Sequence, residues 1–521
     1  MFPGSRRAGL PAVLLLSVCA AGCTLGPDAA SPQPWWNPAS WAATDPATPA
    51  APATPPESRP VAAPVDPDWW RAFGDPQLTA LEQRLAGASL DLRAAGLRLA
   101  EARESLGIVK ASAYPSVHAS TSYTREQESR EGALALASRD AAAAANGAGA
   151  TMASSTNSAL YSPFDLFQYG FDVSWEADLW GRVRRSVEAA DAQVQASAEA
   201  RRDVLVTASA ELARDYITLR GVQRQLAISH GNLDIARQSL ALTRQRAEGG
   251  VTTDLDVANA AAQVSAMEAQ IPPLQAQESA LMNAIGQLLG QPPLALRGEL
   301  AEAKPIPPVP PEVGVGVPAD LVRRRPDLRR AEAELHAATA GIGVAMADFY
   351  PRFTLSGSGA IQGTQFANLA DWGHANTYAF GPSITLPIFE GGRLKRTLEL
   401  RRTQQQEAAL AWQRSFLAAL HEVDNALTAY QAEQQRRVRL ESGVAQNRRA
   451  LELARERYAN GVTDFLHVLV AQQNLLTAER DLAQSTTAVS TDLVTIYKAL
   501  GGGWEGIYPA ASAPAPKPAE G

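Results

Sequence analysis

The sequence predicts a mainly α-helical protein with a small transmembrane β part, built from a duplicated unit. Three observations lead to this fold class. The chain of 521 residues repeats itself, it contains two long stretches without proline, and short segments with strict two-residue alternation precede each of these stretches. Hydrophobic residues make up 46% of the chain and charged residues 19%, which is a globular composition. The net charge of -7 argues against a nucleic-acid partner.

The N-terminal residues have the pattern of an export signal. Arg6 and Arg7 precede an apolar stretch that is too short to remain as a membrane-spanning helix. The sequence Ala-Ala-Gly-Cys that ends at Cys23 resembles the lipobox of bacterial lipoproteins, which implies cleavage directly before Cys23 and acylation of its thiol. A plain signal peptide with an incidental cysteine is the alternative. We therefore expect residues 1–22 to be a signal peptide and residues 23–66, rich in proline and alanine, to be a flexible lipidated tether.

The two halves of the chain match each other. Gly250 and Gly461, each in a Gly-Val-Thr sequence, lie 461 − 250 = 211 residues apart, and this offset holds without a gap from Gly181 onwards. Such a repeat indicates duplication of a unit of roughly 200 residues, too long for a solenoid repeat. The expected division is a first repeat at 67–290, a proline-rich connector at 291–317, a second repeat at 318–501 and a disordered tail at 502–521.

Each repeat is predicted to contain a helix, two strands and then very long helices. The stretches from Arg182 to Glu248 and from Arg393 to Ala459 lack proline and are rich in residues that favour helices. A helix of this length would extend on the order of 100 Å. Each long helix is followed by a returning one. Pro272 and Pro273 are predicted to interrupt the first returning helix, because proline removes a helical hydrogen bond.

Four segments alternate as amphipathic strands do. In the clearest one, Tyr169, Phe171 and Val173 fall on one face, and Asp172 and Ser174 fall on the other. This pattern is typical of outer-membrane barrels, with a half-buried soluble sheet as the alternative. Four strands are too few to close a membrane barrel, and open sheet edges are not tolerated in lipid. Several copies must therefore pool their strands, and a cyclic homotrimer would supply twelve.

Five ordered motifs carry a resemblance to a known family. They are "GCTLGPD" at Gly22, "WWRAFGDPQL" at Trp69, "RRPDLRRAEAEL" at Arg324, "GIGVAMADFYPRFTLSG" at Gly341 and "RYANGVTDFLHVLVAQQNLLTAERDL" at Arg457. Together they resemble the TolC-like outer-membrane factor family, in its NodT-type lipoprotein branch that serves RND multidrug efflux systems. The resemblance implies a homotrimeric 12-stranded β-barrel in the outer membrane, continued by a long periplasmic α-helical tunnel. It also implies a periplasmic adaptor (membrane fusion protein) and an inner-membrane RND transporter as partners.

The function implied by this resemblance is passive export of drugs or other small molecules through the outer membrane, with Cys23 anchored in its lipid and a large periplasmic portion. A duct for type I protein secretion is an alternative within the same fold. A periplasmic helical lipoprotein that acts as a scaffold without a pore is an alternative of another class. The sequence contains no convincing pattern for a metal, a cofactor or a catalytic group, so we expect no enzymatic activity.

The two Gly-Val-Thr sequences resemble the helix-to-helix turns at the periplasmic tips of the family, where the adaptor docks. The expected docking residues are Gly250, Val251, Thr252, Gly461, Val462 and Thr463. The glycines suit the end of a helix, where the backbone needs a positive φ. Thr252 or Thr253 in the first tip, and Thr463 or Asp464 in the second, are predicted to cap the helix that follows.

The resemblance also locates a gate beyond the tips. In the family, a tyrosine before the second tip pairs with an aspartate after the first, and Tyr458 and Asp256 match these positions. Acidic residues that ring the constriction in other members are replaced by His467 and Val470, and an arginine of a common run is replaced by Gln473. We hypothesise that three His467 side chains near the axis make gating sensitive to pH around the ordinary histidine pKa of about 6.5. The alternative is that His467 only packs between helices.

Overall fold

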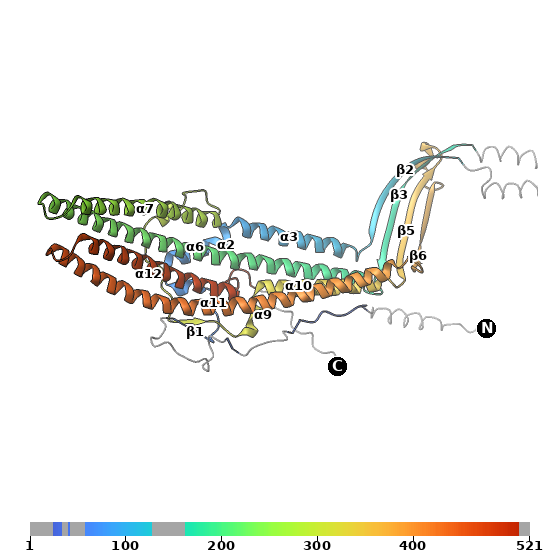
Figure 1. The fold of residues 1–521 in the computed structure, drawn as a ribbon. Helices are drawn as coiled ribbons and strands as arrows, with labels where there is room; N and C mark the ends of the chain where they lie inside the picture. The colour runs from blue at the N-terminus through green and yellow to red at the C-terminus, as the bar shows by residue number, and fades with distance from the viewer. Residues whose placement is uncertain (1–23, 34–39, 42–57, 128–161, 510–521) are drawn as a thin grey trace, which may run out of the picture. The chain divides into compact units, whose positions relative to one another are not determined.

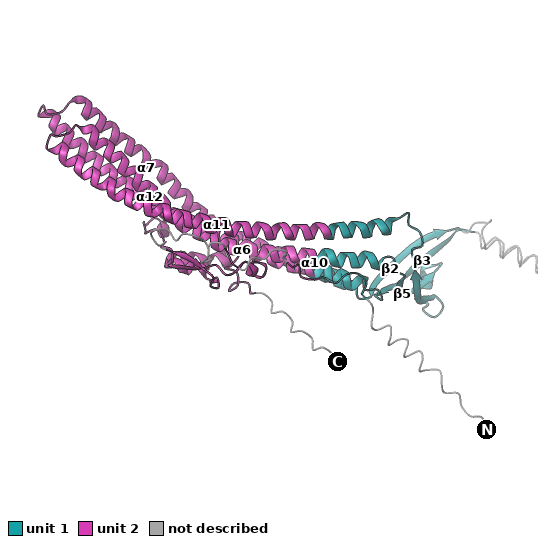
Figure 2. Cartoon of the chain, turned by 60° about the horizontal axis from the view of Figure 1, so that its bottom comes forward, with its two compact units in different colours: residues 1–29, 104–191, 336–405 teal, residues 30–103, 192–335, 406–521 magenta. Residues whose placement is uncertain are grey.

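The computed structural model describes residues 24–33, 40–41, 58–127 and 162–509. The predicted signal peptide and Cys23 lie outside these residues. The chain divides into two compact units, coloured teal and magenta in Figure 2. Unit 1 comprises Met1–Ala29, Glu104–Asp191 and His336–Gln405, and unit 2 comprises Ala30–Arg103, Ala192–Leu335 and Gln406–Gly521.

Helices dominate the fold (Figure 1). They are α2 (Pro76–Ala88), α3 (Leu90–Ala111), α6 (Arg182–Glu248), α7 (Asp254–Leu288), α8 (Arg297–Leu300), α9 (Leu321–Arg324), α10 (Pro326–Ala347), α11 (Arg393–Ala459) and α12 (Phe465–Leu500), with 3-10 helices η2 (Trp69–Phe73), η3 (Pro318–Asp320) and η4 (Phe366–Ala370). The two longest, α6 and α11, have 67 residues each and coincide with the predicted proline-free stretches. Within the described ranges, no helix combines the length and the apolar character needed to cross a lipid bilayer.

The predicted interruption at the double proline is wrong. Helix α7 continues through Pro272 and Pro273 from Asp254 to Leu288. The two prolines remove only their own backbone donors. On either side of them, Ile271 and Met282 are buried and hold the helix against its neighbours. Packing of one face therefore outweighs the local cost of the missing hydrogen bonds.

The strands of unit 1 form one antiparallel sheet. In spatial order they are β2 (Ser116–Glu126), β3 (Phe164–Ala177), β5 (Arg352–Gly363) and β6 (Asn376–Thr385). Their register extends the predicted alternation across the sheet. One row consists of Val117, Val173, Gly357 and Phe380, and the next row consists of Ser116, Ser174, Ser356 and Gly381. The sheet therefore has one apolar face and one polar face, as the sequence predicts.

The apolar face of this sheet is exposed. Phe171 is 62% exposed, Tyr378 77% and Phe380 82%. In the described part of the chain, β2 and β6 each pair on one side only, so the sheet has two open edges. A large exposed apolar surface marks a face that lipid or another protein covers.

The predicted tether and connector are ordered in part. Residues Arg59–Val61 form strand β1, which pairs in parallel with strand β4 (Glu312–Gly314) in unit 2. The amide N–H of Ser58 donates a hydrogen bond to Gln434 Oε1 at 3.0 Å. The prediction of a flexible tether over 23–66 is therefore wrong for this part. A proline-rich stretch favours extended backbone, and Pro60 is tolerated because β1 is an edge strand.

The predicted disordered tail is also wrong for its first residues. Trp504 is 4% exposed and lies against two arginines of unit 2, with the guanidinium carbons of Arg202 and Arg329 4.7 and 5.1 Å from its ring centroid. Its Nε1 donates a hydrogen bond to the carbonyl oxygen of Gly501 at 2.9 Å. Trp504 thus helps to anchor residues 502–509, together with Arg202, which donates hydrogen bonds to the carbonyl oxygens of Tyr508 and Pro509. The rest of the predicted tail, 510–521, lies outside the described residues.

Candidate functional site

Both helix-to-helix turns end their first helix in the same way. The backbone φ is 69° at Gly250 and 73° at Gly461. Val251 donates its amide hydrogen to the carbonyl oxygen of Arg246 at 2.8 Å, and Val462 makes the matching bond at 2.9 Å. This is a Schellman motif, which needs a left-handed residue and so favours glycine. The predicted helix ends are confirmed at both turns, which we call tip 1 (249–253) and tip 2 (460–464).

The start of α7 is capped as predicted. Thr253 Oγ1 accepts the amide hydrogen of Asp256 at 3.3 Å. The Asp256 carboxylate in turn accepts hydrogen bonds from Thr252 Oγ1 at 2.5 Å and from Thr253 Oγ1 at 3.1 Å. The hydrogen bond from Thr252 lowers the pKa of Asp256 below its ordinary value. The charged carboxylate of Asp256, in the first turn of α7, therefore stabilises the backbone of tip 1.

The predicted side-chain cap at tip 2 is not formed. Asp464 occupies the N-cap position of α12, but its side chain makes no capping hydrogen bond. Its Oδ1 instead lies 2.6 Å from Nδ1 of His467. The hydroxyl of Thr463 is buried and has no hydrogen-bond partner among the described residues. The histidine competes for the carboxylate that would otherwise cap the helix.

The predicted pairing of Tyr458 with Asp256 is wrong for the described chain. The Tyr458 hydroxyl is buried without a hydrogen-bond partner in the residues that the structure describes. Its ring packs edge-on against Phe465, with centroids 5.5 Å apart. The carboxylate of Asp256 is taken up by the two threonines of tip 1. The hydrogen bonds of the Asp256 carboxylate are thus made within tip 1, and Tyr458 is held by the packing of its ring against Phe465.

Arg246 connects the last turn of α6 to the last turn of α11. Its guanidinium carbon lies 4.6 Å from the ring centroid of Tyr458, and its Nη1 donates hydrogen bonds to the carbonyl oxygens of Tyr458 at 2.8 Å and Ala459 at 3.3 Å. A cation at these carbonyls is favourable, because the end of α11 carries the negative pole of the helix. The sequence shows an arginine in the last turn of both long helices, Arg246 and Arg457. It does not show which of the two contacts the other repeat, so this residue is missed.

The other predicted gate residues lie along α12. His467 is 65% exposed at its side chain, so in this chain it does not pack between helices. Val470 is also exposed. Gln473 donates a hydrogen bond to Gln263 Oε1 of α7 at 3.3 Å. Its neighbour Gln472, which the sequence does not single out, is buried and donates to Ser239 of α6 at 2.9 Å. Two adjacent glutamines thus fasten α12 to α6 and α7 of the first repeat.

Comparison with known proteins agrees with this architecture. A sequence profile of the outer membrane efflux protein family matches residues 81–291 and 317–502. The pyoverdine export outer membrane protein OpmQ of Pseudomonas aeruginosa is 32% identical over 438 residues, which cover 84% of this chain and 87% of OpmQ. Nodulation protein T of Rhizobium leguminosarum bv. trifolii is 30% identical over 446 residues, which cover 84% of this chain and 88% of that protein.

A solved structure gives the same result. The outer-membrane channel OprN matches with a TM-score of 0.80 at 31% identity, covering 93% of this chain and 100% of OprN. The resemblance inferred from the five sequence motifs is thereby confirmed. With its two matching helical turns and its antiparallel sheet, this chain belongs to the outer membrane efflux protein family.

Proposed function

We propose that this chain is the outer-membrane exit duct of a tripartite RND-type efflux system, through which drugs or other small molecules pass passively to the outside. The observation that carries the proposal is the sheet β2-β3-β5-β6, whose apolar face is exposed and whose two edges are open. The similar export protein OpmQ and the similar outer-membrane channel OprN support the same function. The chain itself supplies a passage, and the energy for export comes from the partner pump.

A homotrimer resolves the open edges. Backbone groups at a sheet edge cannot be left unpaired in lipid. Pairing of β6 in one copy with β2 in the next satisfies both edges, and three copies close a barrel of twelve strands. The long helices α6, α7, α11 and α12 continue as the wall of a periplasmic tunnel. Acylation of Cys23 anchors each copy in the outer membrane.

The tips are the surface that meets the periplasmic adaptor. Val251 and Val462, at the outermost position of each Schellman motif, are 66% and 63% exposed. Exposed apolar side chains on a tight turn favour a protein partner. A pocket of about 240 Å³ lies beside tip 2, lined by Gln238, Ser239, Leu242, Arg455, Tyr458, Ala459, Phe465 and Val468. Three copies would present six tips, with Gly250, Thr252, Gly461 and Thr463 shaping the turns.

The gate is formed by the ends of the same helices. Arg246 holds the end of α11 through Tyr458, and Asp256 holds the start of α7. His467 and Val470 are exposed on α12, and Gln473 ties α12 to α7. In a trimer, three copies of His467 and Val470 would surround the axis at the narrowest point.

The proposal is tested on protein extracted from outer membranes with detergent. We expect a trimer that resists heating and conducts ions in planar lipid bilayers. Deletion of its gene should make the host more sensitive to several unrelated antibiotics. An RND-type adaptor should co-purify with it. A monomer that leaves bilayers silent would overturn the proposal in favour of a scaffold without a pore. Co-purification with a protein-secretion ATPase and its adaptor, without antibiotic sensitivity, would favour type I secretion.

A further inference from the structure

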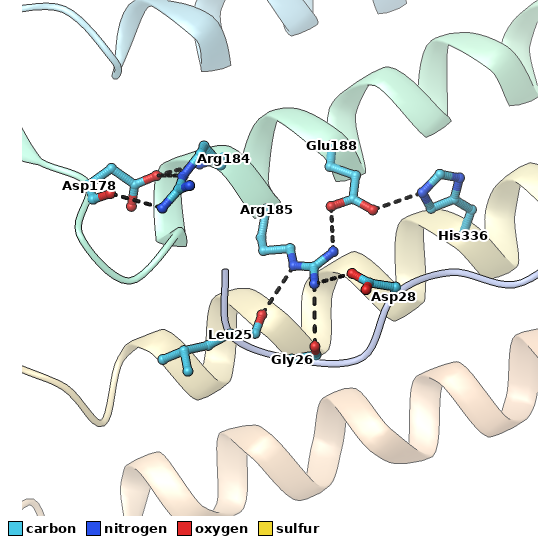
Figure 3. Close-up of polar contacts among 8 residues, drawn as sticks. All are labelled: Leu25, Gly26, Asp28, Asp178, Arg184, Arg185, Glu188 and His336. Atoms are coloured by element: carbon cyan, nitrogen blue, oxygen red, sulfur yellow. Dashed lines mark hydrogen bonds and ion pairs between the residues drawn. The ribbon is translucent and has the colours of Figure 1, made fainter. Parts of the chain in front are cut away.

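The residues that follow Cys23 contact α6 through Arg185 and α10 through Gly343, and all these residues belong to unit 1 (Figure 3). The amide N–H of Leu25 donates a hydrogen bond to the carbonyl oxygen of Trp180 at 3.2 Å. Gly26 has a φ of +97°, and a Cβ at this position would lie 2.5 Å from Cα of Gly343. The two backbones are therefore too close for a side chain at either glycine, which indicates a fitted contact.

Arg185 of α6 clamps this segment. Its guanidinium donates hydrogen bonds to the carbonyl oxygens of Leu25 at 3.1 Å and Gly26 at 3.3 Å, and to Asp28 Oδ1 at 2.6 Å. A fourth bond goes to Glu188 Oε2 at 2.8 Å. The Arg185 side chain is only 5% exposed. Three of its four acceptors belong to the N-terminal segment, so most of the hydrogen bonds of this guanidinium depend on the segment.

Glu188, which accepts a hydrogen bond from Arg185, is itself positioned by a residue of α10. Glu188 Oε1 lies 2.9 Å from Nε2 of His336 on α10 (Figure 3). A Cβ on Gly343 of α10 would lie 2.8 Å from Cγ of Arg185 and from the carbonyl oxygen of Leu25. Side chains of α6 and bare backbone of α10 thus enclose the segment together. We call Arg185, Glu188, His336 and Gly343 the N-terminal dock.

The second repeat offers an internal comparison. Arg396 and Glu399 match Arg185 and Glu188 at the repeat offset, since 396 − 185 = 211 and 399 − 188 = 211. Arg396 is exposed and has no side-chain partner among the described residues. Glu399 is exposed as well and accepts a hydrogen bond from Arg402. Of the two matching pairs, only the one beside the N-terminal segment is covered, with Arg185 buried and Glu188 partly buried.

The turns before the two helices differ in the same way. Gly181, with a φ of +81°, lies so close to Thr24 that a Cβ would be 3.0 Å from its Cα. The matching Gly392, with a φ of +85°, has nothing within 4 Å of an added Cβ. The shared positive φ explains glycine in both repeats. The close approach of Thr24 occurs in the first repeat alone.

We propose that the N-terminal dock holds residues 24–28 and thereby fixes the lipid anchor on Cys23 beside the strand-to-helix junction. This rests on the proposed function, because it requires an acylated Cys23 in the outer membrane. Cys23 is two residues before Leu25, so the backbone allows a separation of roughly 7 Å at most. A free tether of the length of residues 23–66 would instead spread over roughly 35 Å. The dock converts a loose anchor into a fixed one.

Two aromatic residues indicate that the boundary between lipid and water lies at this junction. The rings of Trp180 and Tyr350 lie 4.9 Å apart, and Trp180 Nε1 donates a hydrogen bond to the carbonyl oxygen of Pro351 at 2.8 Å. Tryptophan and tyrosine collect at the boundary between lipid and water, where the ring is apolar and its polar atom is hydrated or bonded. An acyl group attached next to Trp180 would reach the lipid without additional linker residues.

Spin labelling of the full-length protein tests the dock. Pro27 is exposed between Gly26 and Asp28, so a label on Pro27→Cys adds no clash. An acylated Cys23 does not react with the label. We expect an immobilised spectrum for Pro27→Cys alone. Adding Arg185→Gln should raise the ratio of mobile to immobile label by about tenfold, the change expected from loss of charged hydrogen bonds.

Matching positions in the two repeats supply the control variants. Arg396→Gln should leave the spectrum unchanged. Gly343→Ala should release the label, whereas Gly107→Ala, at the matching position of the first repeat with nothing within 4 Å of its Cβ, should not. If the Arg185 variant fails to fold, Asp28→Asn removes one ion pair from an exposed carboxylate and should still mobilise the label. A label that is mobile in Pro27→Cys alone, or equally immobile with Arg185→Gln, would overturn the proposal.

Three further measurements on the same samples keep this result separate from the proposed function. Intact mass reports whether Cys23 is acylated, the oligomeric state reports the trimer, and bilayer conductance reports the pore. A conducting, acylated trimer with a mobile label would contradict the dock alone. An immobile label in a silent monomer would contradict the exit duct and leave the contact itself intact.

Discussion

Arg246 lies over the ring of Tyr458, with its guanidinium carbon 4.6 Å from the ring centroid, and donates a hydrogen bond to the Tyr458 carbonyl oxygen at 2.8 Å. The end of α6 in the first repeat therefore clamps the end of α11 in the second. The matching arginine of the second repeat, Arg457, is exposed. At the repeat offset, Tyr458 corresponds to Ala247, which offers no ring. The contact is therefore made by Arg246 of the first repeat on Tyr458 of the second, and the matching residues Arg457 and Ala247 do not reproduce it.

Substitution of Arg246 should loosen the gate. Arg246→Gln removes a cation–π contact and weakens two hydrogen bonds, a local loss of about 1–3 kcal/mol. We expect higher conductance and longer open times in planar bilayers. Arg457→Gln is the matched control and should behave like the unmodified channel. Equal conductance of the two variants would show that the Arg246 contact does not restrain opening.

His467 should make gating depend on pH. Its exposed ring contacts Asp464, and three copies near a trimer axis would repel one another when protonated. We expect conductance to change between pH 5 and 8 in the unmodified channel and to change less over this range in His467→Ala. His374→Ala, which removes a histidine that also contacts a nearby aspartate but lies in unit 1, serves as control. An unchanged pH profile in the His467 variant would remove this residue from the gate.

Two partly buried aspartates should make the helical part more stable in acid. Burial raises the pKa of Asp215 and of Asp492 to about 6, from an ordinary value of about 3.9. A raised pKa in the folded state means that stabilisation is complete below about pH 4 and is lost as the pH rises through 6. Asp215→Asn and Asp492→Asn should therefore raise the unfolding temperature at pH 7.5 and leave it nearly unchanged at pH 4.

Thermal unfolding followed by circular dichroism between pH 4 and pH 8 measures this effect. The exposed Asp424 on α11 provides the control, because Asp424→Asn should have little effect at either pH. If the Asp215 and Asp492 variants were no more stable than the unmodified protein at pH 7.5, the carboxylates would have to be better solvated than the single chain indicates.

Trp504 should be essential for the C-terminal segment. Its ring is buried and in contact with Arg202 and Arg329, so Trp504→Ala should cost about 3–5 kcal/mol of stability. Truncation after Pro509 should be neutral, and truncation after Gly501 should be as harmful as the substitution. Chemical denaturation compares these variants, with the exposed Trp372→Ala as control. A neutral Trp504→Ala would show that residues 502–509 do not contribute to the core of unit 2.

The repeated features of this protein were determined by its sequence. Absence of proline set the extent of α6 and α11, two-residue alternation set the faces of the sheet, and glycines at a fixed offset marked both helix ends. These are local properties, because each depends on the backbone preferences of the residues concerned and on their periodicity. They therefore appear twice, once in each repeat.

The differences between the two copies come from contacts between distant parts of the chain. Arg185 is buried and Arg396 exposed, and Arg246 is engaged while Arg457 is not, although each pair matches in the sequence. The N-terminal segment and the ring of Tyr458 each exist once per chain, so they can complete only one site of a duplicated pair. The same reason explains the ordered tail around Trp504, whose burial depends on arginines far away in the sequence. Such contacts join residues that no local pattern connects.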